Sequence, residues 1–231
     1  MSAANQLLQI EINQLLSGRD NLTVLEAGCG SVSHIEIPNA SVVVGIDISE
    51  KQLQRNEKLS EKIVGDLQTY PLGKNKYDVI VSWDVLEHLD KPGDALNNLF
   101  GSVADKGIIV LAAPNIVSIK GIVTKLLSHS MQVAFYRYVI GDKRAGIDDQ
   151  GPFKTYLRKS MWPDQVKKSA LEHGLTVPYM NKYEGPVPMH LRQKHKLIDI
   201  LFGFIGAVSR TVLGKSRDLT HSDYMIILQR P

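Results

Sequence analysis

Residues 22–30 read Leu22-Thr-Val-Leu-Glu-Ala-Gly-Cys-Gly30, an apolar run that stops at two glycines separated by one residue. Short apolar runs without alternation are typical of strands that are buried on both faces of a sheet. Glycine adopts backbone conformations that other residues avoid, so the pair predicts a tight turn that a ligand can approach closely. We therefore expect a buried strand that feeds a ligand-binding turn, with Gly28 and Gly30 opening the next helix.

More apolar runs follow this one, and helical stretches separate them. They lie at residues 41–46, 62–64, 77–81 and 107–111, with Ser49 as a natural N-cap and Pro92 near the start of a helix at 92–103. Residues 175–180 and 224–228 would pair as a hairpin that adds an antiparallel strand at the sheet edge. This order predicts an α/β fold with a doubly wound, Rossmann-like sheet that helices cover on both faces.

No linker rich in Pro, Gly or Ser divides the 231 residues, so we expect a single domain with lid insertions. Its expected parts are a leading amphipathic helix in 1–18, a half in 19–115 that contains the ligand-binding turn, a lid in 116–158, and a C-terminal half in 159–231. The last part contains an apolar insertion at 190–217.

The overall charge and the cysteine content limit the function. There are 27 basic and 24 acidic side chains, a net charge of +3, which is too weak a balance to indicate a nucleic-acid partner. The single cysteine, Cys29, permits no internal disulfide and favours a reducing compartment. No secretory signal and no spanning apolar run is visible, so we expect a cytoplasmic protein.

Acidic residues stand where three of the predicted strands end. Asp47 comes 19 residues after Gly28, where a carboxylate can accept both hydroxyls of a ribose, and Asp66 could bind the exocyclic amine of a base. A dinucleotide site would need a third glycine where Ser33 stands, and Glu26 would repel a pyrophosphate. Glu26 can instead anchor an amine, so S-adenosylmethionine fits best. The alternative is that both aspartates are ordinary turn residues.

Five segments form an ordered set of motifs over residues 22–115. They are Val24-Leu-Glu-Ala-Gly-Cys-Gly30, Val44-Gly-Ile-Asp-Ile-Ser49, Val64-Gly-Asp-Leu67, Tyr77-Asp-Val-Ile-Val-Ser-Trp-Asp-Val-Leu-Glu-His-Leu89 and Gly107-Ile-Ile-Val-Leu-Ala-Ala-Pro-Asn115. Together they resemble class I S-adenosylmethionine-dependent methyltransferases, most closely the small-molecule group that includes the ubiquinone-biosynthesis type.

The resemblance implies a seven-stranded sheet with a reversed last strand and a cofactor site at the strand ends. The residues that it implies for this site are Glu26, Gly28 and Gly30 at the methionine end, Asp47 at the ribose, Asp66 with the Leu67 amide at the adenine, and Ser82 with Trp83 beside the methyl group. Ile48 is a further expected cofactor-binding residue. Two departures stand out. The family usually has a third glycine where Val32 stands, and the stretch before Asp47 is short and contains Pro38, so we expect a stubby first helix.

Methyl transfer to an oxygen acceptor would also need a general base, for which His88 and Tyr156 are the candidates. Asp84, Glu87 and His88 are spaced to share one helix face, and some family members hold a divalent metal with such a cluster. Three ligands are few for an oxygen-rich metal site, so we favour a positioning role and expect no metal. We likewise expect Cys29 to be a small residue that fills the turn and not a reactive thiol, because methyl transfer needs no thiol.

Two later stretches leave alternatives open. Aromatic and basic residues in the lid either frame a planar or anionic acceptor or pack the lid on the sheet; they are Tyr136, Tyr138, Phe153, Tyr156 and Arg158. Residues 197–208 are almost wholly apolar, and basic residues flank them: Arg192, Lys194, Lys196, Arg210, Lys215 and Arg217. That segment either packs in the core or a dimer, or meets a membrane surface or a lipophilic acceptor.

The sequence therefore predicts a methyltransferase that uses S-adenosylmethionine to methylate a small molecule and releases S-adenosylhomocysteine. A non-catalytic module that binds an adenosine cofactor, or a membrane-associated interaction module, remains the alternative. A nicotinamide oxidoreductase is disfavoured by Glu26 and the missing glycine. The remaining histidines, His34 among them, are expected at the surface.

Overall fold

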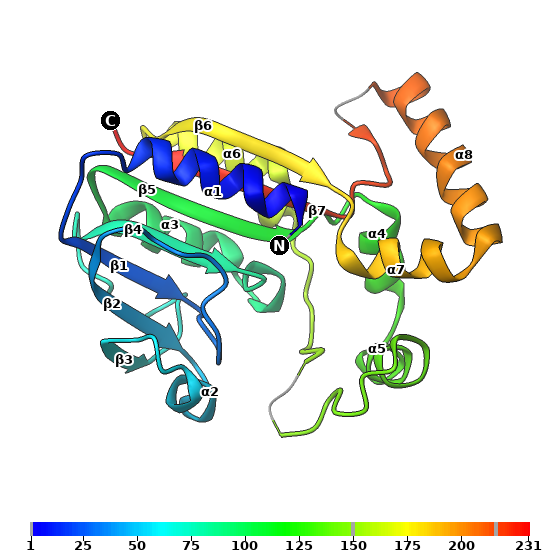
Figure 1. The fold of residues 1–231 in the computed structure, drawn as a ribbon, viewed down its shortest axis with the longest axis horizontal. Helices are drawn as coiled ribbons and strands as arrows, with labels where there is room; N and C mark the ends of the chain where they lie inside the picture. Colours follow the sequence, from blue (N-terminus) through cyan, green and yellow to red (C-terminus); the bar gives the residue numbers. More distant parts are fainter. Residues whose placement is uncertain (1, 149–150, 215–216) are drawn as a thin grey trace. The chain divides into compact units, whose positions relative to one another are not determined.

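The computed structural model describes residues 2–148, 151–214 and 217–231. Seven strands of these ranges form one sheet in the order β3-β2-β1-β4-β5-β7-β6 (Figure 1). The strands are β1 (Leu22–Ala27), β2 (Ala40–Asp47), β3 (Glu61–Val64), β4 (Tyr77–Trp83), β5 (Val103–Pro114), β6 (Thr176–Tyr183) and β7 (Asp223–Gln229). Parallel pairing joins β1 to β2 and β4, β2 to β3, and β4 to β5, so these strands end at the same edge of the sheet.

The last strand is reversed, as the resemblance implies. The Arg230 backbone N–H donates to the Gly107 carbonyl near the beginning of β5 (3.0 Å), and the Asn115 N–H donates to the Ser222 carbonyl beyond its end (2.8 Å). Chain direction in β7 is therefore opposite to that in β5, which confirms the predicted fold class. The expectation that this antiparallel strand lies at the edge is wrong: β7 is inserted between β5 and β6, and β6 forms the edge.

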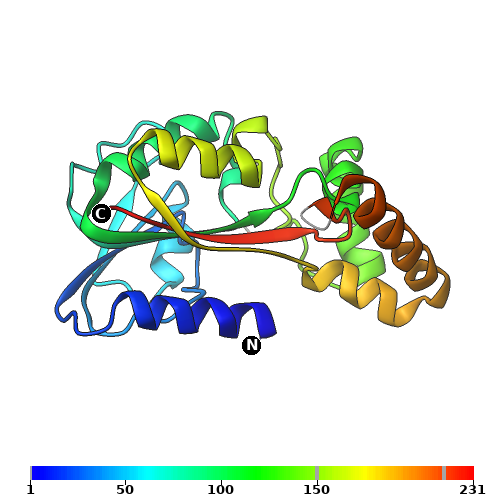
Figure 2. The ribbon, with the colours of Figure 1, turned by 90° about the horizontal axis from the view of Figure 1, so that it is seen from above.

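Helices cover both faces of the sheet, because each presents one apolar side to it. Helix α1 (Ala3–Leu15) buries Leu8 and Ile12 and lies on one face, whereas α3 (Pro92–Ser102) and α6 (Pro163–Glu172) lie on the other (Figure 2). Pro92 and Pro163 stand at the first helical positions, where a missing N–H costs nothing. Three shorter helical elements accompany the sheet: α2 (Glu50–Arg55), η1 (Leu86–His88) and η3 (Lys159–Met161).

The connection from β1 to β2 contains no helix, which corrects the expectation of a stubby first helix that Gly28 and Gly30 would open. The connection spans residues 28–39, which only just reaches the roughly ten to twelve residues that a helical crossover between parallel strands needs, and the glycine turn takes up its beginning. Val32, two isoleucines and Pro38 further oppose a helix in this stretch. The chain crosses from strand to strand as a loop.

The chain divides into two compact units. Unit 1 consists of Met1–Ala113, Arg158–Asn181 and Met225–Pro231, and unit 2 of Pro114–Leu157 and Lys182–Tyr224. Unit 2 thus gathers the stretch predicted as a lid and the apolar insertion, which are far apart in the sequence. Its elements are α4 (Ile119–Leu126), α5 (His129–Phe135), the π-helical turn η2 (Tyr136–Ile140), α7 (Pro186–Lys194) and α8 (Lys196–Leu213). Within the described ranges, no helix combines the length and apolar character needed to cross a bilayer.

A buried carboxylate joins the two segments of unit 2. Asp223, which is 7% exposed, accepts hydrogen bonds from Lys120 Nζ (2.6 Å) and from Ser222 Oγ (2.5 Å). Ser222 Oγ in turn accepts from the Gly185 N–H (2.8 Å), and a Cβ at Gly185 would collide with the Asp223 carboxylate. Because a buried charge must be paired and hydrogen-bonded, this cluster fixes the start of α4 against the segment before α7.

Candidate functional site

The predicted cofactor residues of unit 1 lie at or just beyond the carboxyl ends of β1, β2, β3 and β4. Glu26 lies beside Gly45 of β2 and Val81 of β4, and Asp47 lies beside Val64 of β3. In open α/β sheets, ligands bind at this edge. The structure therefore brings the predicted residues together along one row of strand ends.

The glycine turn folds back onto β2. Gly28 and Gly30 have φ values of +72° and +53°, in the left-handed region that favours glycine. The Gly28 N–H donates to the Ile46 carbonyl (2.7 Å), and the Gly30 N–H donates to Asp47 Oδ2 (2.9 Å). A Cβ at Gly28 would lie 2.5 Å from Val85 Cγ2, so this turn requires glycine for space as well as for conformation.

Asp47 holds two turns at once. Its Oδ2 accepts from Gly30 and its Oδ1 from the Ser49 N–H (2.8 Å), and Ser49 caps α2 as predicted, because its side chain accepts from the Gln52 N–H. Each carboxylate oxygen has further lone pairs, so the side chain can still accept hydroxyl donors. The next residue, Ile48, is 76% exposed and presents an apolar surface beside the carboxylate.

Asp66 lies in the turn that follows β3. It accepts hydrogen bonds from the backbone N–H (2.9 Å) and the side-chain amide of Gln68, whose Oε1 accepts from the Lys91 N–H (2.7 Å) just before α3. The neighbouring Leu67 is buried and anchors this turn. Asp66 is therefore fixed in place with part of its surface open to solvent.

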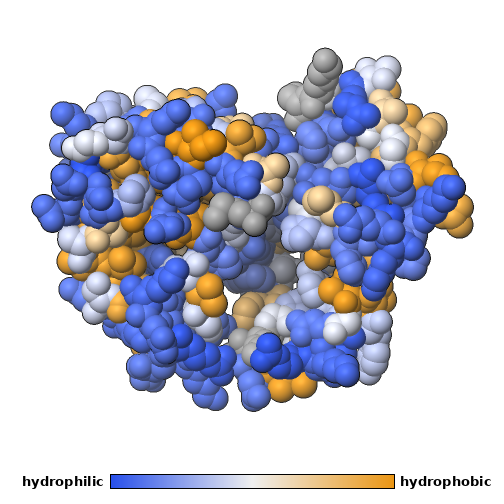
Figure 3. Space-filling view, in the orientation of Figure 1, coloured by the Kyte–Doolittle hydropathy of each residue, from blue (hydrophilic) through white to orange (hydrophobic). Residues whose placement is uncertain are grey.

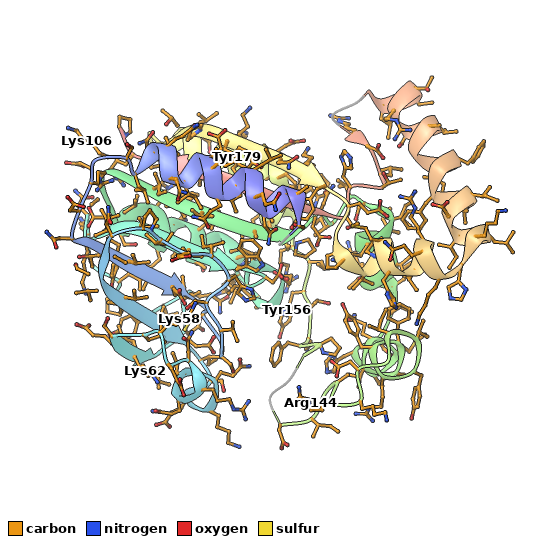
Figure 4. All side chains as sticks on the ribbon, viewed as in Figure 1. Lys58, Lys62, Lys106, Arg144, Tyr156 and Tyr179 are labelled. Carbon is orange, nitrogen blue, oxygen red and sulfur yellow. The ribbon has the colours of Figure 1, made fainter. Side chains whose placement is uncertain are left out.

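Glu26 is a buried carboxylate with few neutralising partners. It is 8% exposed and accepts a hydrogen bond from Ser33 Oγ (2.7 Å), a residue of the 31–39 loop. Burial raises the pKa of Glu26, and the hydrogen bond from Ser33 and the charge of Lys58 only partly oppose this. Figure 4 labels Lys58, on the segment between α2 and β3. A ligand ammonium group would supply the missing positive charge, so the site fits an amino-acid cofactor.

Cys29, inside the same turn, is not a nucleophile. Burial raises the pKa of its thiol to about 12, and the carboxylates of Asp47 and Glu26 act in the same direction. Its sulfur packs so closely that a Cβ at Gly45 would lie 2.9 Å from it. The observed thiol fills space, as the sequence suggests.

At the end of β4, Ser82 and Trp83 are available for a ligand. In the described part of the chain, Ser82 Oγ is buried without a hydrogen-bond partner, an arrangement that calls for a bound group or water. The indole ring of Trp83 stacks on the imidazole of His34, with ring centres 5.5 Å apart and planes 8° from parallel. Although part of His34 remains exposed, the surrounding protein removes hydration from the ring and lowers its pKa.

Sequence reasoning assigned no role to His34. It stands in a loop without periodicity, 49 residues from Trp83, and no local pattern signals their stacking. A lowered pKa keeps this imidazole neutral near pH 7, when a ring nitrogen can accept a proton.

Asp84, Glu87 and His88 do not share a helical face, although their spacing would allow it. Asp84 has a φ of +52° and precedes the short 3₁₀ turn η1, so it lies outside the turn that holds the other two residues. Glu87 is buried, and its Oε1 lies 3.9 Å from His88 Nε2. Among the residues that the structure describes, no three His, Cys, Asp or Glu side chains are grouped closely enough to hold a metal ion.

The lid residues divide between the two units. Arg158 belongs to unit 1, where it forms an ion pair with Asp90 and donates from Nε to the Asp90 carbonyl (3.0 Å). Tyr156, labelled in Figure 4, belongs to unit 2, with Lys154 Nζ 4.9 Å from its ring centre. Phe153 and Tyr138 are 40% and 80% exposed, and Tyr136 packs edge-on against Phe135.

Tyr156 also lines a cavity of about 160 Å³ within unit 2. Three basic side chains but no carboxylate line it, and its lining residues are Thr124, Lys125, Leu127, His129, Gln132, Lys154, Thr155, Tyr156 and Leu157. The buried Gln132 holds its walls together, because Nε2 donates to the carbonyls of Thr124 (3.1 Å) and Leu127 (3.2 Å). This cavity has the charge of an anion-binding site.

Residues 25–111 match the family model described as a methyltransferase domain. An uncharacterized protein of Methanocaldococcus jannaschii is 28% identical over 118 residues, which are 50% of this chain and 52% of that protein. The aligned region therefore spans about half the length of this curated relative.

Solved structures share the fold over nearly the whole chain. An S-adenosylmethionine-dependent methyltransferase from Mesorhizobium loti has a TM-score of 0.57 at 12% identity and covers 99% of both chains. The magnesium protoporphyrin IX methyltransferase of Synechocystis, solved with bound S-adenosylhomocysteine, has a TM-score of 0.55 at 16% identity over 98% of this chain and 83% of that one.

The [4+2]-cyclase SpnF has a TM-score of 0.57 at 15% identity over 99% of this chain and 81% of its own. At such identities these likenesses show the fold alone. The chain thus has the fold of S-adenosylmethionine-dependent methyltransferase structures, and its residues 25–111 resemble a methyltransferase domain.

Proposed function

We propose that the protein transfers a methyl group from S-adenosylmethionine to a small-molecule acceptor and releases S-adenosylhomocysteine. One observation carries this proposal: Glu26, Asp47 and Asp66 stand at or beyond the carboxyl ends of adjacent strands within the matched segment. When bound, the cofactor supplies a methyl group made electrophilic by its sulfonium. The protein supplies alignment of the two reactants and exclusion of water.

Each residue has a proposed task that suits its surroundings. The buried carboxylate of Glu26 attracts the amino group of the cofactor, with Gly28 and Gly30 allowing close approach. Asp47 accepts the ribose hydroxyls. The remaining proposed contacts are Asp66 and Leu67 at the adenine, and Ser82 and Trp83 beside the methyl group. Ile48 is proposed as a further cofactor contact beside Asp47.

For an oxygen acceptor we propose His88 or Tyr156 as the general base. The His88 side chain is 27% exposed and lies next to the Glu87 carboxylate, which would stabilise the imidazolium formed by proton uptake. Tyr156 presents a phenolic hydroxyl, and Lys154 Nζ lies 4.9 Å from its ring centre.

We further propose that the acceptor carries an anionic group, because basic side chains and no carboxylate line the cavity of unit 2. Lys125 and Lys154 supply positive charge, and His129 and Thr155 can supply hydrogen-bond donors. A volume of about 160 Å³ suits a carboxylate or phosphate group better than a complete lipid. The acceptor is therefore proposed to be a polar anion rather than a purely lipophilic molecule.

Metal-independent transfer is the remaining part of the proposal. The exposed Asp84 and the buried Glu87 face different surroundings, so with His88 they make a poor ligand set. Turnover should survive exhaustive treatment with EDTA. Loss of turnover that Mg²⁺ or Zn²⁺ restores would make these residues metal ligands.

The experiment measures S-adenosylhomocysteine released from S-adenosylmethionine with a panel of small carboxylated, phosphorylated and neutral acceptors. We expect release with an anionic acceptor, and Lys154→Ala should raise KM for that acceptor at least tenfold without changing cofactor affinity. Lys143→Ala, an exposed lysine outside the cavity lining, is the matched control. Cofactor binding without any turnover would favour the non-catalytic alternative, and turnover with neutral acceptors alone would remove the anion proposal.

A further inference from the structure

Helix α8 turns an apolar face toward solvent. Leu197, Ile200, Leu201, Phe204, Val208 and Val212 are 82%, 59%, 54%, 66%, 44% and 73% exposed. Most of these positions recur every three or four residues, so the side chains share one side of the helix. Figure 3 shows hydrophobic side chains gathered along the outer edge of α8. Such a contiguous patch on a soluble protein marks an interaction surface.

The opposite side of α8 is the one that packs on unit 2, although it is smaller and more polar. Gly206 and Ser209 are its buried residues, and a Cβ at Gly206 would lie 3.1 Å from Thr220 Cγ2. Ser209 Oγ accepts from the Leu219 N–H (3.2 Å) and donates to the Gly206 carbonyl. A helix that only covered a core would bury its leucines and phenylalanines instead. The orientation is therefore the reverse of an ordinary core helix.

Two carboxylates on and beside α8, Asp199 and Asp218, are each paired with an arginine. Asp199 accepts from Arg192 Nε (2.7 Å), and Asp218 accepts from Arg210 Nη1 (2.6 Å). Lys194 and Lys196 are exposed at the beginning of α8, and Arg217 is exposed beyond its end. Lys215, another predicted flanking cation, lies outside the described residues. The apolar face thus has cations at both ends and no carboxylate along its length.

We propose that α8 lies in the surface of a membrane that contains anionic lipids, with its apolar face among the acyl chains. The helix lies in the plane of the membrane surface, because it is not long and apolar enough to cross the bilayer. The terminal cations meet anionic headgroups, which attract such residues strongly near the surface. A second copy of the chain fits less well, because either direction of helix pairing would place cationic ends against each other without acidic partners.

The structure also selects the residues for a test. Phe204 is exposed, whereas Phe202 is half-buried on the other side of α8, so Leu201→Glu/Phe204→Glu tests the outer face. Leu126→Glu/Leu171→Glu is the matched control, because these leucines are 80% and 52% exposed outside α8. Lys194→Gln/Lys196→Gln tests the electrostatic part.

Flotation of the full chain with vesicles measures binding to phosphatidylcholine alone and mixed with phosphatidylglycerol. We expect wild type to bind the anionic vesicles at least tenfold better, the α8 variant to lose binding, and the lysine variant to lose its salt dependence. The control should bind like wild type, and all variants should retain S-adenosylhomocysteine binding, which keeps this test separate from the proposed function.

Absence of vesicle binding by wild type, or an α8 variant that binds vesicles like wild type, overturns the proposal. A wild-type dimer that the α8 variant dissociates, without vesicle binding, would assign the face to self-association.

Discussion

Asp47 Oδ2 accepts a hydrogen bond from the Gly30 backbone N–H at 2.9 Å, so the carboxylate proposed to bind ribose also closes the glycine turn. With Ser49 bound to Oδ1, this side chain ties β1, β2 and α2 together before any ligand arrives. A site that is organised in advance spends less binding energy on ordering its loops. Because Asp47 has both roles, substitutions there affect ligand binding and fold stability to different extents.

Asp47→Asn should weaken binding of S-adenosylhomocysteine at least tenfold, because charge-assisted hydrogen bonds to ribose are each worth about 1.5–3 kcal/mol. Asp47→Ala should lower the free energy of unfolding by about 1–3 kcal/mol and more than Asp47→Asn does, since Ala leaves two backbone N–H groups without an acceptor whereas the Asn amide keeps one acceptor oxygen. Calorimetry and urea unfolding measure the two effects. Asp105→Asn, at the opposite end of β5, is the control, and unchanged affinity in Asp47→Asn would contradict the ribose role.

Gly28→Ala should destabilise the fold more than Gly18→Ala. Both glycines have a φ near +75° (+72° and +75°), which costs a residue with Cβ about 1–2 kcal/mol, but only Gly28 has Val85 in the way. Overpacking adds about 1–3 kcal/mol at Gly28. Urea unfolding of both variants measures the difference. In a double-mutant cycle, Val85→Ala should recover part of the Gly28→Ala loss, and equal losses at both glycines would refute the steric explanation.

Glu26→Gln should raise Tm at pH 7. Burial raises the folded-state pKa of Glu26 above 4.5, so the folded protein binds the proton more tightly than the unfolded chain. Wild type therefore loses stability as pH rises from 4.5 through the folded pKa, and the variant does not. The difference in Tm should shrink toward zero near pH 4.5, and S-adenosylhomocysteine should stabilise wild type more than the variant. A lower Tm in Glu26→Gln at pH 7 would contradict this account.

The stacking of His34 on Trp83 can be followed by fluorescence. A protonated imidazole quenches a stacked indole. The surrounding protein removes hydration from the His34 ring and lowers its pKa, so emission should fall as the pH is lowered, with a midpoint below pH 6.5. A Trp162→Phe background isolates Trp83, because the chain has two tryptophans. The step should vanish in His34→Gln. A midpoint at or above 6.5 would show that the ring is not desolvated.

Local patterns in the sequence were sufficient to predict most strands of unit 1 and the residues at their ends. Buried strands are visible as uninterrupted apolar runs, Ser49 caps α2 as predicted, and Pro92 stands in the first turn of α3. Positions at strand ends follow from those runs, which is why Glu26, Asp47 and Asp66 could be placed together on a parallel sheet. Each of these features depends on neighbouring residues alone or on the general rules of parallel sheets.

The conformation of the 31–39 loop and the assembly of unit 2 depend on residues that are distant in the sequence, so only the tertiary structure shows them. The 31–39 loop forms no helix because a short crossover and β-branched residues outweigh the usual topology, and this loop then brings Ser33 to Glu26 and His34 to Trp83. The two insertions join as one unit through the buried Asp223, which no local pattern reveals.

The sequence likewise shows that residues 197–208 are apolar but not which side of the helix is buried. The run 197–208 contains a single charged residue, Asp199, so its pattern does not show which side of the helix faces the protein, and packing decides it. In this protein the small residues Gly206 and Ser209 allow close contact with residues 218–220 and so occupy the inner side. That contact leaves the large apolar side chains of α8 exposed.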